Sequence, residues 1–500
     1  MSIALLLEMA VSGDPHRLAV VDRGTRFTTT ELSRFASGGA GVIGTAGVQH
    51  VAYVGTGGHM LPLLIFSSAR AATPFTPLNY RLSAAGLQQL IGRLPEPLVV
   101  ADPEFVELVA GAGKRVMTSE EFTQAASAAE PLEEFADPDE VAIVLFTSGT
   151  TSQPKAVELT HNNLTGYVTG TVEFGSADAD DAALVCVPPY HIAGVGAALS
   201  NLYAGRRIVY QCKFDPREWA RLVRDERVTS ATVVPTMLDR IIAELEASPT
   251  DLPTLRTLAY GGSKVSLPLV RKTIAMLPHV GMVNAYGLTE TSSTIAVLTP
   301  EDHRMAYAAT EEAVSRRLAS VGRPVPGIEV QIRDENGAVR PAGQPGELFV
   351  RGPQVSGRYT GIGSVLDADG WFPTRDTATL DDDGYLFIGG RSDDTIIRGG
   401  ENIAPAEVED VLVEHPNVRE AVVVGVDDPQ WGQIIVAVVV PEQGAEIDVE
   451  DLSEFARKAL RGSRTPDRIE IVEQLPTTDT GKVLRREIIR QLSENLRSAT

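Results

Sequence analysis

The sequence predicts an α/β protein with a large N-terminal body and a smaller α+β unit at the C-terminus. Its 500 residues exceed the ~250–300 residues at which a single hydrophobic core stops growing, so we expect at least two domains. Short β-branched runs alternate with longer amphipathic stretches, as in parallel-rich α/β folds. The alternation restarts after residue 393, and we therefore place the domains at residues 1–393 and 394–500.

The expected strands of the N-terminal body are short apolar runs suited to burial in a parallel sheet. They span residues 98–101, 141–146, 182–187, 207–210 and 230–234. Two amphipathic stretches, 216–225 and 236–247, are predicted helices. From about residue 325, Gly, Pro and Asp separate the apolar runs. A small antiparallel β region is therefore predicted from residues 329–333, 346–351 and 385–388.

In the C-terminal unit we expect helices at 405–415 and 449–460, and strands at 421–426 and 434–440. The last of these strands is the longest apolar run of the chain, and it is far shorter than the ~18 residues that a membrane span needs. The short apolar run at the N-terminus has no basic residue before it, unlike a secretory signal. We therefore expect no integral membrane segment and a cytoplasmic location.

Charge limits the partners of the chain. It has 44 Lys and Arg against 66 Asp and Glu, a net charge of −22, which disfavours nucleic acid as a partner. Residues 457–490 run against this trend, with nine basic and five acidic residues and a net charge of +4. A polyanionic ligand would dock best near that segment. With only Cys186 and Cys212, a disulfide framework or Cys-based zinc site is excluded.

One glycine-rich run has the residue pattern of a dinucleotide-binding fingerprint, but the segments around it do not fit such a site. Residues 39–44 read G-x-G-x-x-G, but the preceding stretch, 30–37, is helix-like rather than strand-like. No acidic residue occurs between Gly44 and Glu96, so the ribose-binding acid expected ~20 residues on is missing. We interpret the run as a Gly-rich surface helix. An NAD-dependent oxidoreductase remains an alternative on this match alone.

A hydroxyl-rich loop follows the expected strand at 141–146. It reads Thr147-Ser148-Gly149-Thr150-Thr151-Ser152-Gln153-Pro154-Lys155. Hydroxyls can donate to phosphate oxygens, Gly149 lets the backbone approach them, and Lys155 adds positive charge. Thr160 is predicted to N-cap a helix that starts at His161. The pattern therefore predicts a phosphate-binding loop.

At this loop the chain resembles the adenylate-forming superfamily, which includes acyl-CoA and aryl-CoA synthetases, luciferases and peptide-synthetase adenylation domains. Six further motifs follow in the family's order, and such a series is highly specific. They are Tyr286-Gly287-Leu288-Thr289-Glu290; Gly346-Glu347-Leu348 with Gly352-Pro353; Thr374-Arg375-Asp376; Gly390-Arg391-Ser392-Asp393-Asp394; Gly399-Gly400-Glu401-Asn402-Ile403-Ala404-Pro405 with Glu407-Val408-Glu409; and Leu475-Pro476 with Thr480-Gly481-Lys482.

The resemblance implies that the protein joins a carboxylic acid to the α-phosphate of ATP and releases pyrophosphate. Lys482 would neutralise charge at that phosphate. Glu290 would ligate Mg²⁺, with Thr289 beside it, and His191 would lie at the carboxylate site. The nucleotide would contact the loop residues Thr147, Ser148, Gly149, Thr150, Thr151 and Lys155, together with Gly262, Ser263, Tyr286, Gly287, Asp376 and Arg391. In this scheme Asp376 accepts the ribose hydroxyls.

The resemblance also implies a second half-reaction with a thiol, for which CoA is the leading acceptor. The C-terminal unit would rotate about Asp393 and bring Arg398, Gly399 and Gly400 to the site, with Trp431 near CoA. The segment 463–466 departs from the family pattern, so an acyl-AMP ligase that loads a carrier-protein pantetheine is an alternative. A non-catalytic nucleotide-binding relative is another.

Four residues depart from the superfamily's motifs. Ser152 and Ala156 replace glycines of the phosphate loop, Arg375 replaces the glycine before Asp376, and Thr477 replaces a basic residue. The identity of the acid is predicted only as a class. Small and apolar residues follow His191, which favours a hydrophobic fatty or aromatic acid; they are Ile192, Ala193, Val195 and Gly196.

Overall fold

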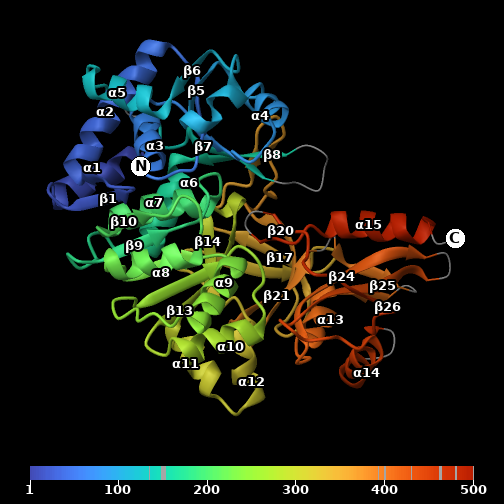
Figure 1. Ribbon diagram of the computed structural model, residues 1–500. Helices are drawn as coiled ribbons and strands as arrows, with labels where there is room; N and C mark the ends of the chain where they lie inside the picture. The colour runs from blue at the N-terminus through green and yellow to red at the C-terminus, as the bar shows by residue number, and fades with distance from the viewer. Residues whose placement is uncertain are drawn as a thin grey trace.

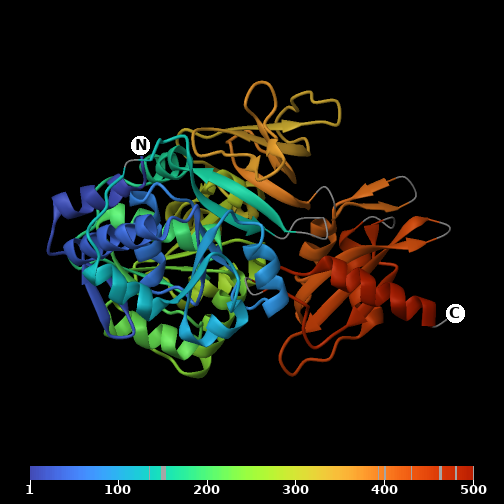
Figure 2. The same cartoon turned by 90° about the horizontal axis from the view of Figure 1, so that it is seen from above.

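The computed structural model describes residues 1–134, 136–147, 154–391, 394–398, 401–428, 431–460, 464–478 and 481–498. Figures 1 and 2 show a large N-terminal body and, beside it, a smaller C-terminal unit in orange and red. Two large sheets, a small antiparallel sheet and the sheet of the C-terminal unit form the framework. None of the described helices is long and apolar enough to cross a membrane.

The first large sheet has nine strands in the order β15-β14-β13-β12-β11-β9-β10-β1-β2. Its six central strands, from β13 to β1, run parallel, and the outer strands β2, β14 and β15 pair antiparallel. The strands are β1 (Leu18–Asp22), β2 (Thr25–Thr28), β9 (Ala182–Val185), β10 (Arg207–Tyr210), β11 (Ser230–Val233), β12 (Thr257–Gly261), β13 (Gly281–Leu288), β14 (Ser293–Leu298) and β15 (Arg323–Pro324).

The second large sheet has eight strands in the order β19-β18-β8-β7-β4-β3-β5-β6. Strands β7, β4, β3, β5 and β6 are parallel, whereas β8, β18 and β19 add antiparallel pairs at one side. The strands are β3 (His50–Val54), β4 (Phe75–Leu78), β5 (Pro97–Ala101), β6 (Arg115–Thr118), β7 (Val141–Thr147), β8 (Lys155–Thr160), β18 (Arg358–Tyr359) and β19 (Gly363–Ser364).

Helices cover both large sheets and fill the space between them. The α-helices of the body are α1 (Ala4–Gly13), α2 (Thr29–Ala46), α3 (Met60–Arg70), α4 (Ala84–Ile91), α5 (Ser119–Ala128), α6 (His161–Thr171), α7 (Ile192–Ala204), α8 (Pro216–Asp225), α9 (Pro235–Ala247), α10 (Leu267–Met276), α11 (Pro300–Ala308) and α12 (Glu312–Ser315). Three 3₁₀ segments, η1 (Pro103–Val109), η2 (Thr289–Thr291) and η3 (Arg316–Ala319), complete the body.

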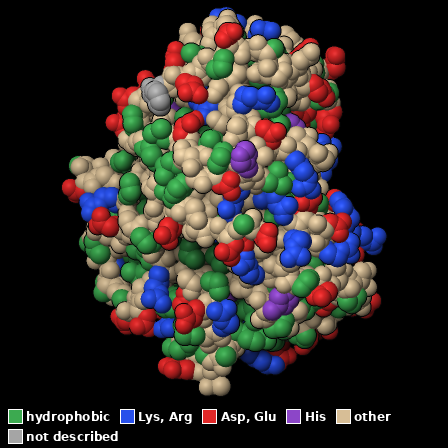
Figure 3. All heavy atoms as spheres, turned by 90° about the vertical axis from the view of Figure 1, so that its left-hand side faces the viewer, with side chains coloured by type: hydrophobic (Ala, Val, Ile, Leu, Met, Phe, Trp, Pro, Cys, Tyr) green, Lys and Arg blue, Asp and Glu red, His purple; other side chains and the backbone are tan. Residues whose placement is uncertain are grey.

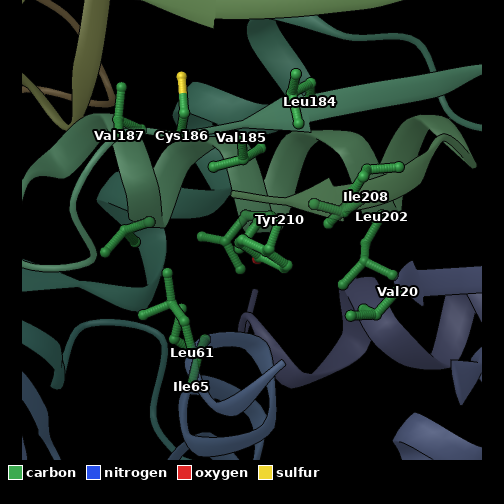
Figure 4. Close-up of a cluster of buried hydrophobic side chains, with 14 of the residues drawn as sticks. Val20, Leu61, Ile65, Leu184, Val185, Cys186, Val187, Leu202, Ile208 and Tyr210 are labelled. Carbon is green, nitrogen blue, oxygen red and sulfur yellow. The ribbon is translucent and has the colours of Figure 1, made fainter. Parts of the chain in front are cut away.

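The main hydrophobic core lies between the two large sheets. Side chains of β9 and β10 pack toward Leu61 and Ile65 of α3 (Figure 4). On the second sheet, Tyr53 belongs to this main core, whereas Val54 belongs to a separate cluster on the opposite face. Strands buried on both faces carry continuous apolar runs; such runs predicted the strands at 98–101 and 141–146, whereas β3 was not predicted.

A small antiparallel sheet and the C-terminal unit complete the fold. The small sheet contains β16 (Glu329–Arg333), β17 (Gly346–Arg351), β20 (Phe372–Leu380) and β21 (Leu386–Arg391). The C-terminal elements are β22 (Ile396–Arg398), β23 (Glu401–Ile403), α13 (Pro405–Leu412), β24 (Val418–Asp428), β25 (Gly432–Pro441), α14 (Val449–Ala459), β26 (Arg468–Ile471) and α15 (Arg485–Ser498). This architecture confirms the predicted fold class. The boundary at Asp393 stays a prediction, because that residue lies outside the described residues.

The structure corrects the interpretation of the glycine-rich run. The run is helical, as predicted, but residues 39–43 of its helix α2 are buried, and only Gly44 of the run is exposed. A Cβ at Gly38 would lie 1.9 Å from the carbonyl oxygen of Ala126 in α5, and one at Gly39 would lie 2.2 Å from the Ser67 hydroxyl. The glycines therefore permit close helix packing instead of cofactor binding.

We expect Gly38→Ala to lower the free energy of unfolding by about 1–3 kcal/mol, because the added methyl group overpacks a backbone contact. The measurement is the midpoint of urea or thermal unfolding. Gly170→Ala in α6 is the matched control: its nearest neighbour would be 3.7 Å away, so it should be neutral or stabilising. Equal stability of the Gly38 variant and the wild type would contradict this packing argument.

Candidate active site

The centre of the candidate site is the carboxylate of Asp376, which is only 5% exposed. The hydroxyl of Tyr286, on β13, donates to its Oδ2, and Nη1 of Arg391 lies 3.3 Å from its Oδ1. Asp376 and Arg391 face each other on the paired strands β20 and β21. Burial raises the pKa of Asp376, while Arg391 and the Tyr286 hydrogen bond act in the opposite direction. Two sheets thus meet at one carboxylate.

Glu290 lies in the short 3₁₀ segment η2, which starts at Thr289. Its Oε1 accepts a hydrogen bond of 2.9 Å from the hydroxyl of Tyr359, on β18. Nζ of Lys155 lies 5.3 Å from the centre of the same tyrosine ring, within the range of a cation–π contact. Tyr359 therefore links the proposed metal ligand to the end of the phosphate loop, and sequence reasoning did not single it out.

The two ends of the proposed phosphate loop are held together by strand pairing. Thr147 ends β7 and faces Lys155, the first residue of β8. The helix predicted after the loop is confirmed as α6, and Thr160 caps it through a reciprocal capping box with Asn163. The loop residues Ser148, Gly149, Thr150 and Thr151 lie outside the described residues.

Lys482 approaches the site from the C-terminal unit. The turn that carries it is closed by a 2.7 Å bond from the Thr478 amide to the Lys482 carbonyl. Its side chain keeps solvent exposure, yet surrounding protein atoms desolvate the ammonium group and lower its pKa. The charge of Arg391 lowers the pKa further, and the acidic groups near it, Asp376, Asp394 and Glu290, act in the opposite direction.

Two contacts dock the lysine turn and its unit on the N-terminal body. Gly481 has φ +73°, and a Cβ on it would lie 2.5 Å from the side chain of Thr236 in α9. Nζ of Lys264 lies 2.6 Å from Oδ1 of Asp410 in α13. Because Lys264 directly follows the predicted nucleotide segment at 261–263, this ion pair joins that segment to the C-terminal unit.

Two of the predicted nucleotide-binding residues, Gly262 and Ser263, follow the end of β12. Gly262 has φ +85°, a conformation that favours glycine. The hydroxyl of Ser263 is buried and has no hydrogen-bond partner within the described parts of the chain. A buried orphan hydroxyl costs free energy unless a ligand or water satisfies it. Gly287 is also constrained, since a Cβ there would lie 1.8 Å from the carbonyl oxygen of Ser293.

The predicted acid-side residues gather at the start of α7. His191 occupies the N-cap position without a capping side-chain bond, and its ring centre lies 4.7 Å from that of Tyr190. Ile192 and Ala193 are partly buried, whereas Val195 is fully buried. The apolar character predicted for this region is therefore present next to the histidine.

The predicted thiol-side residues are described only in part. The guanidinium carbon of Arg398 lies 4.8 Å from the centre of the Trp431 ring, and that indole is 43% exposed. Arg398 also makes two hydrogen bonds to the carboxylate of Asp467. Asp393, Gly399 and Gly400 lie outside the described residues.

Ion pairs neutralise much of the basic segment at 457–490. Within the described residues of this segment, five basic side chains are paired with carboxylates, and the partners of Arg464 and Arg485 lie 57 and 76 positions away in the sequence. The pairs are Lys458–Glu454, Arg464–Glu407, Arg468–Glu470, Arg485–Glu409 and Arg490–Glu487. The net charge of +4 therefore overstates the positive charge that this segment can offer to a ligand.

Comparisons with known proteins agree with the family resemblance that the sequence motifs indicate. The model of the AMP-binding enzyme family matches residues 7–360, and that of the AMP-binding enzyme C-terminal domain matches residues 407–482. A feruloyl-CoA synthase of an Amycolatopsis species is 35% identical over 95% of this chain and 96% of its own length. The fatty acid–[acyl-carrier-protein] ligase ScoC of Streptomyces coeruleorubidus is 32% identical over 95% and 93%, respectively.

The chain belongs to the AMP-binding enzyme family.

A solved structure of o-succinylbenzoate CoA synthetase from Bacillus subtilis, in complex with the acyl-adenylate intermediate, superposes on this AMP-binding enzyme with a TM-score of 0.83. It is 26% identical and covers 97% of both chains. The predicted membership of the adenylate-forming superfamily and its α/β architecture are confirmed. The predicted enzyme class, an AMP-forming acid–thiol ligase, is confirmed by the family and its ligase relatives.

Arg375, which replaces a glycine of the superfamily motif, has an unusual backbone conformation in this AMP-binding enzyme. The residue has φ +61°, in the left-handed region, where a side chain costs about 1–2 kcal/mol relative to glycine. Its amide donates to Oε1 of Glu347 over 3.2 Å, and its charge acts on Tyr359. The arginine is thus kept beside the site despite an unfavourable backbone conformation.

We expect Arg375→Gly to be more stable than Arg375→Ala by about 1 kcal/mol, because both variants lose the charge and only glycine relieves the backbone. Chemical unfolding of the two variants measures this difference. If Arg375→Ala is as stable as Arg375→Gly, the left-handed conformation carries no cost at this position.

Proposed function

We propose that the protein activates a carboxylic acid with ATP to an acyl adenylate, releases pyrophosphate, and then transfers the acyl group to the thiol of CoA. The observation that carries this proposal is that the turn of Lys482 packs against α9 of the N-terminal body, where the charges of Asp376 and Glu290 act on the lysine. The CoA-ligase relatives support the same reaction class.

In this proposal the nucleotide contacts residues of β7, β8 and β20 and the segment that follows β12. Asp376, already aligned by Tyr286 and Arg391, accepts the ribose hydroxyls. The orphan hydroxyl of Ser263 supplies a donor on the adenine side. Thr147 and Lys155 hold the two ends of the loop that contacts the phosphates. A carboxylate held in place before binding loses little entropy when it accepts the ribose hydroxyls.

Charge neutralisation is the main task of the first step, because a carboxylate anion approaches a polyanionic phosphate. A lysine ammonium about 4 Å from that charge contributes about 4 kcal/mol at an effective dielectric of about 20. The acidic neighbours of Lys482 oppose the fall in its pKa and favour its charged form. His191, at the start of α7, would orient the acid carboxylate.

Mg²⁺ fits the donor set at Glu290. A hard cation prefers carboxylate and phosphate oxygens, and when bound it would neutralise phosphate charge. The bond from the Tyr359 hydroxyl to Oε1 holds the Glu290 carboxylate in a fixed orientation. Tyr359 thereby acts as a positioning residue for the proposed metal ligand.

For the thiol step we propose that the C-terminal unit turns about Asp393, moves Lys482 away, and presents the region of Arg398, Gly399 and Gly400. The exposed indole of Trp431, stacked on Arg398, gives an apolar surface for a pantetheine arm. A carrier-protein pantetheine is the second candidate acceptor, favoured by the likeness to the ligase ScoC.

A hydrophobic fatty or aromatic acid is the proposed substrate class. The partly buried Ile192 and Ala193 beside His191 form an apolar surface next to the proposed carboxylate position. The feruloyl-CoA synthase relative supports an aromatic acid, and ScoC supports a fatty acid. We expect the protein to act in the cytoplasm.

The test of this function is pyrophosphate release over a panel of fatty and aromatic acids with ATP and Mg²⁺. We expect Lys482→Ala to slow release about a thousandfold, which corresponds to the loss of about 4 kcal/mol. Lys458→Ala is the matched control, because this exposed lysine pairs with Glu454 on the surface of the same unit. Unchanged release in Lys482→Ala would refute the assigned role.

The acceptor is identified by adding CoA or a phosphopantetheinylated acyl carrier protein to the active acid. We expect a CoA thioester by mass spectrometry. Thioester on the carrier protein alone would establish the second candidate. If ATP binds but no acid releases pyrophosphate, the protein is a non-catalytic nucleotide-binding relative.

The pH dependence of pyrophosphate release gives a separate check on Lys482. Desolvation lowers the pKa of Lys482, so the ammonium charge is present below that pKa and lost as pH rises through it. We therefore expect the rate to fall on an alkaline limb centred below the ~10.4 of a free lysine. Lys482→Arg stays charged throughout, so any residual activity in that variant should lack the limb. An identical alkaline limb in the arginine variant would contradict this assignment.

A further inference from the structure

A cavity lined by two arginines lies on the side of the N-terminal body opposite the C-terminal unit. Its volume is about 140 Å³, and it opens between the end of α1, β1 and the C-terminal end of α7. These elements lie at the left of Figure 1, and Figure 3 shows that face, where hydrophobic side chains lie among charged ones. The lining includes Asp14, Arg17, Phe174, Tyr203 and Arg206.

The charge of Arg17 is already satisfied by the backbone. Its Nη2 donates to the carbonyl oxygens of Ala177, over 3.1 Å, and Asp178. The contact depends on Gly205, which follows α7 with φ +81° and whose Cβ position would lie 3.4 Å from the guanidinium carbon of Arg17. Arg17 therefore forms a fixed wall of the cavity.

Arg206 differs from Arg17 because no carboxylate in the described part of the chain pairs with it. The side chain is half-buried, and burial lowers the pKa of its guanidinium. Acidic groups of the same region have other partners: Asp181 pairs with Arg256, and Glu226 pairs with Arg207. Asp14 lines the same cavity, but among the described residues no ion pair joins it to Arg206. A partly desolvated charge without a counter-ion is unfavourable, and an anion in the cavity would remove that cost.

The rest of the cavity suits an apolar body. The Phe174 side chain is 40% exposed, and its ring centre lies 5.3 Å from that of Tyr203. A second hollow of about 290 Å³ shares Gly13 and Phe174 with the first and continues to Met9. Since a cavity of about 150 Å³ accommodates a benzene ring, the first hollow has room for one ring, and the second extends it.

We propose that this cavity is a second ligand site, which binds a small amphiphilic carboxylate. Its carboxylate pairs with Arg206, and its aryl or alkyl body packs on Phe174 and extends toward Met9. Asp14 also lines the cavity, and its negative charge nearby disfavours a multiply charged anion such as phosphate more strongly than a single carboxylate. His191 and Arg206 flank opposite ends of α7, about 20 Å apart at 1.5 Å per residue, so this site is separate from the proposed acid site.

The test uses the full-length protein with ¹³C-methyl-labelled methionine, because Met9 is one of eight methionines and lines the extension of the cavity. Cinnamate is the probe. We expect the Met9 methyl resonance to shift saturably on titration, and Arg206→Gln to weaken that binding at least about tenfold, as the loss of a charge-assisted bond implies. Arg304→Gln, at an exposed arginine of α11, is the matched control and should bind as the wild type does.

Further arms distinguish carboxylate binding in this cavity from nonspecific association and from binding at the proposed acid site. Neutral cinnamamide and inorganic phosphate should leave the Met9 signal unchanged. The Lys482→Ala variant should show the same cinnamate shift as the wild type. This result does not depend on whether the protein has ligase activity. Arg206→Lys keeps a positive charge and should retain part of the affinity, which covers the case that Arg206→Gln does not fold. An unmoved Met9 signal, or equal shifts with cinnamate and cinnamamide, would overturn the proposal.

Discussion

The buried carboxylate of Asp376 is the interaction on which the arrangement of the site depends. It receives the hydroxyl of Tyr286 from the nine-stranded sheet and the guanidinium of Arg391 from the small antiparallel sheet. A charge removed from water must be paired and hydrogen-bonded to be tolerated. The carboxylate therefore ties the two sheets together at the site, and its charge also acts on the lysine of the C-terminal unit.

Much of this arrangement could be predicted from the sequence, because the relevant residues stand at the ends of apolar runs. Thr147 directly follows the strand predicted at residues 141–146, so its placement follows from the alternation of strands and helices. Tyr286 was recognised by its motif, because the strand that carries it, β13, was not predicted. Asp376 was recognised by its motif, although the strand that carries it, β20, was not predicted. That strand lacks a continuous apolar run, since its buried positions alternate with partly buried ones and with the exposed Arg375.

The remaining features depend on contacts between distant residues, which local patterns do not encode. Tyr359 meets Glu290 across 69 positions, and no motif marks the tyrosine. Arg464 meets Glu407 across 57 positions, so a count of charges along the chain overestimates the positive surface. The burial of α2 was likewise unreadable, because glycines that face solvent and glycines that face another helix have the same local sequence signal.

The close contact between Gly481 and Thr236 has a mechanical consequence for the reaction cycle. With no side chain at residue 481, the lysine turn can settle directly on the start of α9. Any larger residue would act as a spacer between the two units and hold the ammonium group of Lys482 away from Asp376 and Glu290, although every side chain of the proposed site would still be present. The fit of the two units thus depends on Gly481, the residue directly before the charged Lys482.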